Sequence, residues 1–458
     1  MQFRSTKLNT SQQSGQQKLP IEVSFKEQAS FKEQASFKEA VLRCLPPEGG
    51  LYVPSTVPDL RQFFLDMDDK TTYPELVATV TPGLLENDLD LQSASRVAKS
   101  AFDFEPELVR LDDDFSILNL YNGPSGVFKD FGVAFFGAVL EELLKNTGQA
   151  MIVSAVRGDT GLSLTGAFQN RKGITSVLVY PSGPVLGLDS KDFITNGGNT
   201  IPIQIRGSFD ECQSLITSLI NDRPFAERHN VTSANTVNPC RLLSQAFYYL
   251  FAFVKVRKYL GAKDLIFSIP SGNFGNFISG LYAWKFGMPV NGFIAAMNIN
   301  DAFGNFIRGG SFIPHPVIAT NSPAMDIAQP QNYERLVSFY NEAPAVMRNM
   351  VFPAAIDDEE TQRIMEWVWK KYSLIIDPHT AVAFAAARKF HESGDRHTHT
   401  VILATGHPAR EAEMVRKATG QFMELPEKLG NLKKQLNPIA LIDPHLEALE
   451  SVIASCYN

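Results

Sequence analysis

The sequence predicts an α/β fold, with parallel sheets flanked by helices and a mainly helical amino-terminal region. Two observations support this prediction. From about residue 150 onward, short apolar runs alternate with helical patterns, which is typical of strand–helix–strand units. Residues 51–110, in contrast, have a mainly helical and acidic pattern without a chemical motif. Ligands of such sheets bind in the loops at the carboxyl ends of strands, so a functional site is expected in those loops.

The amino-terminal region contains a hexapeptide repeat. Residues 24–29 recur at 30–35 and partly at 36–40. A period of six rotates each phenylalanine by about 240° around a helix, so the three phenylalanines would point three ways and only one or two could be buried. The last copy is therefore expected to be the one that begins a helix, and residues 46–50 are expected to end that helix.

The remaining elements follow from the apolar pattern. Strands are predicted at 151–156, 176–180, 265–269, 292–297 and 400–404. Helices are predicted at 162–170, 277–285 and 411–417, and another is expected to begin near Lys129 and continue through 133–140. Several of these helices directly follow a strand and a short loop, as a parallel sheet requires.

The chain has 458 residues, about three times a typical domain length, so two or three domains are expected. The predicted division is a mainly helical domain at 1–105, a large α/β domain at 106–150 and 240–430, a small α/β domain at 151–239, and a helical tail at 431–458. The sequence makes no prediction of the oligomeric state.

Composition excludes several classes of function. The net charge is −7 and no long basic run is present, which argues against nucleic acid or an anionic membrane as a partner. The longest apolar run, 246–254, is too short to cross a bilayer. The four cysteines show no metal-ligand spacing, which favours a reducing compartment with neither a disulfide framework nor a metal site. Residues 1–17 lack the apolar core of a signal peptide, so a cytoplasmic location is expected.

Lys129 is the first candidate for chemistry. It lies between Phe128 and Phe131 at an expected helix start. Burial and the positive end of a helix both disfavour its ammonium form, and a lysine with a lowered pKa suits Schiff-base chemistry. Considered alone, Lys129 is also explained as a lysine that extends along a helix face to reach solvent.

The loop 270–276 has the composition of a phosphate-binding loop. It follows a predicted strand and opens a predicted helix, whose amino end favours an anion. Its candidate residues are Ser271, Gly272, Asn273, Phe274, Gly275 and Asn276. The loop lacks the Gly-Lys-Ser/Thr ending of a nucleotide-binding loop, which disfavours a nucleoside triphosphate. A plain tight turn with a helix cap is the alternative.

Two further loops complete a possible site. Residues 157–161 join a strand to a helix and could hold a carboxylate, while Asp159 either faces a cofactor hydroxyl or caps the helix. Thr405 places a neutral hydroxyl at another strand end, and His407 is expected to be structural. A reactive lysine, a phosphate loop, a carboxylate loop and a hydroxyl together indicate a pyridoxal-phosphate site.

The motifs resemble those of the threonine synthase family, in the same order and at similar spacing. They lie at 123–130, 158–161, 270–276, 321–326, 377–379 and 405–409, and 1–7 and 47–54 look like signatures of the bacterial and fungal branch. The resemblance covers nearly the whole chain, and only the additional copies of the repeat are foreign to it. It implies the tryptophan-synthase-β-like fold (fold type II) of pyridoxal-phosphate enzymes. It also implies conversion of O-phospho-L-homoserine, a small phospho-amino acid, and water to L-threonine and phosphate.

The resemblance implies a role for each matched residue on the cofactor side. Lys129 forms the Schiff base and shuttles protons at Cα, Cβ and Cγ. Asp159 lies near the phenolic oxygen of pyridoxal phosphate. Thr405 lies near the pyridine nitrogen, where a neutral hydroxyl leaves that nitrogen unprotonated. The loop 271–276 holds the cofactor phosphate, chiefly through Gly272, Asn273, Phe274 and Gly275.

The substrate side is less determined. Arg157, Gly158 and Thr160 are expected around the carboxylate of the amino acid. The candidates for the substrate phosphate are Asn235, Asn238 and Arg241, because an arginine and amides suit a dianionic leaving group. Hydrogen bonding between domains explains this second trio equally well.

Several residues differ from the family pattern around the expected site. Val156 and Arg157 stand where Thr-Ser is usual before Gly158, and Gly406 stands where alanine is usual. Arg157 either binds the substrate carboxylate or fills its pocket. Two alternatives to a threonine synthase therefore stay open. One is a diverged lyase that eliminates phosphate from a related phospho-amino acid, and the other is a catalytically silent paralogue.

Overall fold

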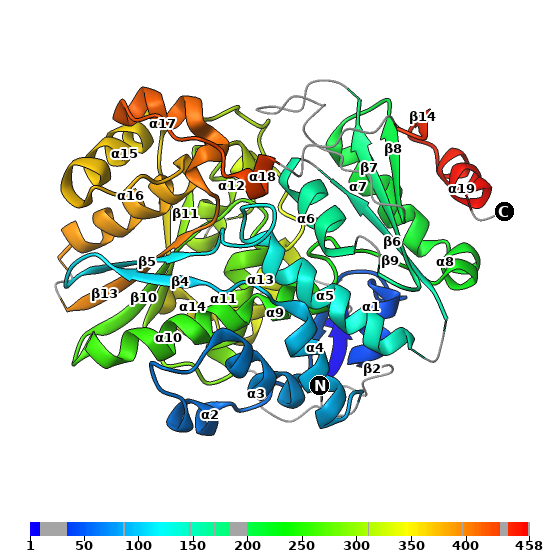
Figure 1. Ribbon diagram of the computed structural model, residues 1–458, viewed down its shortest axis with the longest axis horizontal. Coiled ribbons are helices and arrows are strands. Elements are labelled where there is room, and N and C mark those ends of the chain that lie inside the picture. Colours follow the sequence, from blue (N-terminus) through cyan, green and yellow to red (C-terminus); the bar gives the residue numbers. More distant parts are fainter. Residues whose placement is uncertain are drawn as a thin grey trace, which may run out of the picture.

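The computed structural model contains two large sheets that lie side by side, each covered by helices (Figure 1). The structure describes residues 1–9, 34–85, 88–145, 148–156, 158–168, 171–182, 199–309, 311–394, 397–430 and 438–456. One sheet has six strands and the other has five. A smaller sheet of three strands lies in the amino-terminal region.

The six-stranded sheet forms the larger body, on the left of Figure 1. In spatial order its strands are β12 (Val351–Ala355), β11 (Gly292–Met297), β10 (Asp264–Pro270), β13 (Thr398–Ala404), β5 (Phe115–Asn119) and β4 (Glu107–Arg110). All neighbours are parallel except β4 and β5. Strands β11 and β13 are buried along their whole length, as a parallel sheet covered on both faces requires.

Alternate residues of β10 face two separate cores. Leu265, Phe267 and Ile269 pack in a large cluster that includes helices α5 (Lys129–Leu144), α10 (Ala246–Leu260) and α11 (Gly275–Lys285). Ile266 packs on the other face with α15 (Asp358–Tyr372), α16 (Pro378–Glu392) and α17 (Ala412–Thr419). This two-sided burial follows from the period of two along a strand.

The five-stranded sheet forms the second body, on the right of Figure 1. Its order is β14 (Ala440–Ile442), β8 (Thr200–Ile205), β7 (Ile174–Pro181), β6 (Ala150–Ala155) and β9 (Val231–Thr232), and every pairing is parallel. Its helices are α6 (Gly158–Phe168), α7 (Phe209–Asn221), α8 (Arg223–His229) and α19 (Leu446–Ser455). The carboxyl-terminal segment therefore packs with this sheet.

The other elements surround these two bodies. The amino-terminal region contains β1 (Gln2–Ser5), η1 (Thr6–Asn9), β2 (Ala35–Ser36), α1 (Phe37–Arg43), β3 (Tyr52–Pro54), α2 (Arg61–Asp66), α3 (Tyr73–Leu85) and α4 (Leu91–Ala101). The connections carry α9 (Pro239–Ser244), α12 (Ala302–Ile307), η3 (Pro323–Met325), α13 (Tyr333–Glu342), α14 (Pro344–Met350), η4 (Pro408–Glu411) and α18 (Glu427–Gly430). No helix in the described ranges has the length and apolar character needed to span a membrane.

The predicted α/β fold with parallel sheets is confirmed, and each of the five predicted strands is present as β6, β7, β10, β11 or β13. Strands β5, β8, β9, β12 and β14 were not predicted. They are short or carry an internal proline, such as Pro202 in β8 and Pro353 in β12, which weakens the apolar strand pattern.

The repeat is described only in its last copy, because residues 10–33 lie outside the described residues. Ser36 caps α1 through a capping box, in which its hydroxyl accepts from the Glu39 amide at 3.2 Å and the Glu39 carboxylate accepts from the Ser36 amide at 2.8 Å. Phe37 is buried. The last copy therefore starts a helix, as predicted, while the part of the prediction that concerns the earlier copies lies outside the described residues.

Candidate active site

Lys129 is the first residue of α5, at the end of a turn that the loop 405–410 holds from one side. The Phe128 amide donates to the Thr405 carbonyl at 3.0 Å. The Arg410 guanidinium donates to the Ser125 carbonyl at 2.9 Å. An isolated antiparallel bridge joins Val127 to Gly406. These contacts bring the start of α5 and the end of β13 together, although they lie far apart in the sequence.

The neighbouring Asp130 fixes the same turn from inside. Its carboxylate accepts from the Ser125 hydroxyl at 2.6 Å and from the Ser125 amide at 2.8 Å. The Ser163 hydroxyl, from α6 of the other body, donates to it at 2.6 Å. Burial raises the pKa of Asp130, while these hydrogen bonds oppose the rise. Gly123 is required here, because a Cβ at that position would lie 2.5 Å from Asp130 Oδ2.

Lys129 and Thr405 line one cavity, as the sequence predicted for two residues of one site. The full lining is Val127, Phe128, Lys129, Ala324, Asp377, His379, Thr405, Gly406, His407, Arg410 and Glu411. Thr405 is only 7% exposed, so its hydroxyl faces a sheltered environment. His407 uses Nδ1 to accept from the Ala409 amide at 3.2 Å, which agrees with its expected structural role.

The loop 271–276 closes against the backbone of Ala324 and Met325. A Cβ on Gly272 would lie 2.7 Å from the Met325 Cα and 3.2 Å from the Ala324 carbonyl oxygen, so this close approach requires glycine. Phe274, the cap of α11, has φ 59° in the left-handed region. Because Ala324 also lines the Lys129 cavity, the loop adjoins that cavity.

The side chains of this loop differ in what they still offer a ligand. Ser271 donates its hydroxyl to the Ile269 carbonyl at 2.8 Å, so it builds the loop. Asn273 accepts from the Gln331 amide at 2.6 Å. Asn276 accepts at Oδ1 from two tyrosines, Tyr248 and Tyr249, at 2.6 and 2.7 Å.

The side-chain nitrogen of Asn276 differs from the paired atoms described above. Nδ2 is buried and has no hydrogen-bond partner among the described residues. The first amides of α11 also lack intrahelical acceptors, as at any helix start. A buried unpaired donor beside a helix amino end fits a bound phosphate, which would supply the missing acceptor.

Only part of the expected carboxylate loop is described. Arg157 lies outside the described residues, and the side chains of Gly158 and Asp159 are likewise not described. Helix α6 begins at Gly158, and Thr160 in its first turn is partly buried. Since Ser163 lies one turn further along α6 and contacts Asp130, the first part of α6 lies close to the Lys129 turn.

The expected phosphate trio divides into three different situations. Asn235 brackets the end of β6, because it accepts from the Ala155 amide at 3.0 Å and donates to the Ala155 carbonyl at 2.9 Å. Asn238 donates to the Val41 carbonyl at 2.9 Å and to the Thr232 hydroxyl at 3.2 Å, and it caps α9. Its amide is therefore used for packing between elements, which favours the hydrogen-bonding alternative for this residue.

Arg241 keeps an unused donor. It is 3% exposed and donates through one terminal nitrogen to the Ala234 carbonyl. Its Nε is buried without a partner among the described residues, as is Nε2 of the nearby Gln245. Burial lowers the pKa of Arg241 to about 10, and the charge of Asp130 opposes this shift. A buried guanidinium with a free donor remains suited to an anionic group.

Sequence reasoning missed three residues that build this region. Ser163 contacts Asp130 from the other body. Arg335 is fully buried in α13 and donates to the Thr236 and Val237 carbonyls, each at 2.6 Å. His379 lines the cavity beside Lys129. Only the Asp377-Pro378-His379 motif was visible as a signal, whereas Ser163 and Arg335 lie within ordinary helical patterns.

Comparisons with known proteins agree with this site. The sequence matches the family described as pyridoxal-phosphate dependent enzyme over residues 110–406. It also matches "Threonine synthase N terminus" at 24–102 and "Threonine synthase, C-terminal" at 380–453.

Named relatives cover most of the chain. A threonine synthase of Serratia marcescens is 32% identical over 390 residues, which is 85% of this chain and 89% of the relative. One from Saccharomyces cerevisiae is 28% identical and covers 91% of this chain and 95% of the relative. The crystal structure of threonine synthase from Escherichia coli has a TM-score of 0.84 at 29% identity, with all of both chains covered.

A structure of threonine synthase from Brucella melitensis, with pyridoxal phosphate bound, has a TM-score of 0.81 at 26% identity and covers 92% of this chain and 97% of that chain. The predicted tryptophan-synthase-β-like fold and the predicted cofactor are thus confirmed. On its sequence matches and its fold, this chain belongs to the threonine synthase family of pyridoxal-phosphate enzymes.

Proposed function

We propose that this chain is a threonine synthase, converting O-phospho-L-homoserine and water to L-threonine and phosphate. The observation that carries the proposal is that Lys129 and Thr405 line one cavity, which adjoins the Gly272 loop through Ala324. A lysine, a neutral hydroxyl and a phosphate loop at the carboxyl ends of parallel strands match the needs of pyridoxal-phosphate chemistry. Family membership supports the same reading.

Pyridoxal phosphate, when bound, supplies an electron sink that stabilises negative charge on the amino acid. We propose that Lys129 holds it covalently and moves protons at Cα, Cβ and Cγ of the substrate. Thr405 would offer the ring nitrogen a neutral hydroxyl. The amides of 272–275 and Asn276 Nδ2 would hold the phosphate of the cofactor. Asp159 would face its phenolic oxygen.

On the substrate side, we propose that Arg157, Gly158 and Thr160 surround the carboxylate of the amino acid. Arg241 is the favoured partner for the leaving phosphate, because its buried Nε is unpaired among the described residues. Asn235 supports this arrangement by fixing the strand end that leads into the 157–160 loop. For Asn238 we propose only a place in the 235–241 segment, because its amide is used by Val41 and Thr232.

The predicted domain boundaries stay a proposal. The sheets support these boundaries. Strands β4 and β5 belong to the six-stranded sheet, whereas β6, which begins at Ala150, belongs to the five-stranded sheet. We place the cofactor mainly on the body around 106–150 and 240–430 and the substrate partly on the body around 151–239. A cytoplasmic location, without nucleic-acid or membrane partners, completes the proposal.

The test is product analysis of purified protein supplied with pyridoxal phosphate and O-phospho-L-homoserine. Threonine and phosphate are expected. Phosphate with 2-oxobutyrate and no threonine would favour a diverged lyase instead. Absence of turnover together with absence of a visible cofactor band would favour a silent paralogue.

A second measurement addresses the substrate side. Arg157→Ser restores the residue that the family usually has. The proposal expects a larger change in the affinity for the amino acid than in the affinity for the cofactor. Equal changes in both affinities would show that Arg157 does not lie at the carboxylate.

A further inference from the structure

His379 lies in the wall of the Lys129 cavity and forms hydrogen bonds through both ring nitrogens. Nδ1 is 2.7 Å from Asp377 Oδ2, and the Ala324 amide lies 3.2 Å from Nε2. Asp377 is itself fixed, because it caps α16 and accepts from the Thr380 amide at 3.0 Å. The reaction described above assigns no role to this motif.

These contacts determine which ring nitrogen carries the hydrogen. A carboxylate only accepts, so Nδ1 must donate to Asp377. A backbone amide only donates, so Nε2 must accept from Ala324. The neutral ring with its hydrogen on Nδ1 satisfies both partners at once. Asp377 therefore orients His379 so that a single acceptor atom meets the Ala324 amide.

The residue that His379 contacts, Ala324, is one of two adjacent residues whose backbone lies against the phosphate loop. Ala324 and Met325 belong to η3, whose backbone lies against Gly272 so closely that a Cβ there would be 2.7 Å from the Met325 Cα. Ala324 is exposed and lines the cavity, whereas the adjacent Met325 is buried, so burial restrains Met325 but not Ala324. The hydrogen bond to His379 adds a restraint at Ala324, where burial gives none.

We propose that His379 is a positioning residue that sets the width of the phosphate loop by holding Ala324 and Met325 against Gly272. This inference rests on the proposed function, because it treats the Gly272 loop as the cradle of the cofactor phosphate. It also gives a reason for the glycine at position 406. A Cβ at Gly406 would lie 3.1 Å from Asp377 Oδ2, so the glycine leaves room for the atom that orients His379.

The experiment compares pyridoxal-phosphate binding to the apo forms of the wild type, His379→Leu and His379→Gln, by absorbance titration. Glutamine keeps an acceptor near the position of Nε2, whereas leucine keeps none. His445→Leu, in the carboxyl-terminal segment outside the cavity, is the matched control. Because one hydrogen bond is at stake, roughly threefold to tenfold weaker binding is expected for the leucine variant. The glutamine variant and the control should bind within about twofold of the wild type.

Two results would overturn the role of His379: a leucine variant that binds as tightly as the wild type, or a glutamine variant as weak as the leucine variant. If the wild type bound no pyridoxal phosphate, the proposed function itself would fail, which is a distinguishable result. The apo forms of the leucine and glutamine variants should unfold at similar temperatures. If weaker binding by the leucine variant came only from a damaged fold, that variant would unfold at a lower temperature than the glutamine variant.

A measurement on the unmodified chain avoids variants that fail to fold. Hydrogen exchange of the Ala324 amide in the apoprotein should be at least about tenfold slower than for an unprotected amide, although the residue is exposed. Exchange at the unprotected rate would show that the hydrogen bond to His379 is absent in solution and would overturn the inference.

Discussion

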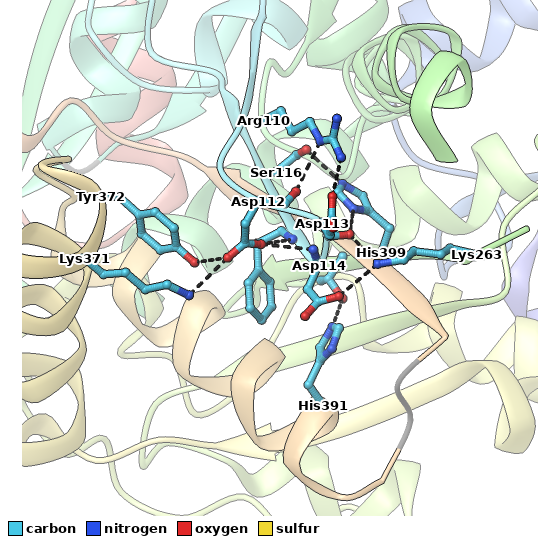
Figure 2. A network of polar contacts seen from close by, with 12 residues as sticks. Arg110, Asp112, Asp113, Asp114, Ser116, Lys263, Lys371, Tyr372, His391 and His399 are labelled. Atoms are coloured by element: carbon cyan, nitrogen blue, oxygen red, sulfur yellow. Dashed lines mark hydrogen bonds and ion pairs between the residues drawn. The ribbon is translucent and has the colours of Figure 1, made fainter. Parts of the chain in front are cut away.

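The two edges of the six-stranded sheet treat their polar groups in opposite ways. At the amino ends of β5 and β13, a network pairs the polar groups of the turn 112–114 with Lys263, Tyr372 and His399 (Figure 2), although the buried Thr398 hydroxyl at the start of β13 lacks a partner among the described residues. Toward the carboxyl ends, three buried donors on Arg241, Gln245 and Asn276 lack partners among the described residues. We propose that the first edge serves stability and that the second keeps nitrogen donors available for anionic ligands.

The amino edge shows how complete such pairing can be. Asp112 accepts from the Asp114 and Phe115 amides at 3.0 and 2.9 Å and also from Lys371 and Tyr372 (Figure 2). Burial alone would raise the pKa of Asp112, but these hydrogen bonds outweigh burial and lower it. Unpaired buried donors cost free energy, so the group of three nitrogen donors toward the other edge supports the proposal of an anion site there.

The largest expected effect comes from removing the lysine at the carboxyl edge. Lys129→Ala should abolish the visible cofactor band and lower kcat/KM by at least about 1000-fold, because both covalent attachment and proton transfer are lost. Lys263→Ala is the matched control, since Lys263 pairs with Asp114 at the amino edge at 3.0 Å. Its activity should be close to that of the wild type. Steady-state kinetics and absorbance spectra check both variants, and equal losses would break the comparison.

The second effect concerns the unpaired amide of Asn276. Asn276→Asp keeps the acceptor for Tyr248 and Tyr249 but replaces the Nδ2 donor by a negative charge. Repulsion between this charge and the cofactor phosphate should weaken pyridoxal-phosphate binding by about tenfold or more. The apoprotein should lose little stability. An unchanged dissociation constant would mean that Asn276 does not face the phosphate.

Truncating a side chain at the amino edge should instead lower stability and leave activity nearly unchanged. Asp112→Ala removes the acceptor of two backbone amides and of Tyr372 and Lys371. A loss of about 1–3 kcal/mol in the free energy of unfolding is expected, because several donors lose their partner. The value of kcat/KM should stay within about twofold of the wild type. Denaturant unfolding and kinetics on the same preparation measure both, and a large loss of activity without a loss of stability would contradict the account.

The smallest expected effect is a pH dependence at His399. Its Nδ1 donates to the Asp113 carbonyl and its Nε2 accepts from the Ser116 hydroxyl, each at 2.9 Å (Figure 2). Burial lowers its pKa below the ordinary value of 6.5. Below pH 6.5 the unfolded chain therefore binds a proton that the folded chain refuses, and stability is lost as the pH falls.

His399→Gln should make this loss shallower between about pH 7 and pH 5, because it removes the titrating group. Chemical unfolding at several pH values measures the slope. A slope identical to that of the wild type would show that His399 does not contribute. At neutral pH the variant should keep its activity, because His399 lies at the edge away from the site.

The sequence was a good guide where one element carries its own signal. The strands β10, β11 and β13 are long and apolar, and the turn before Lys129 and the loop 270–276 have distinctive compositions. The sequence also placed Lys129 and Thr405 in one site, and the cavity contains both. Local composition decides the strands and the two loops, whereas the pairing of Lys129 with Thr405 followed from the expectation that strand-end loops of one sheet converge.

The features that escaped prediction depend on contacts between distant segments. Ser163 meets Asp130 across the two bodies, and Arg335 reaches the 236–237 carbonyls from a separate helix. For Asn238 the sequence left two roles open, and its hydrogen bonds to Val41 and Thr232 favour packing between elements. A polar residue inside a helical pattern reads as a surface residue until its partner is known.

The central claim is that the carboxyl edge carries out phosphate release and threonine formation through Lys129. The most direct measurement follows phosphate and threonine together in one reaction of the wild type with O-phospho-L-homoserine, beside Lys129→Ala. Equal amounts of the two products from the wild type, and neither from the variant, are the predicted result. Phosphate without threonine from the wild type, or undiminished turnover by the variant, would contradict the claim.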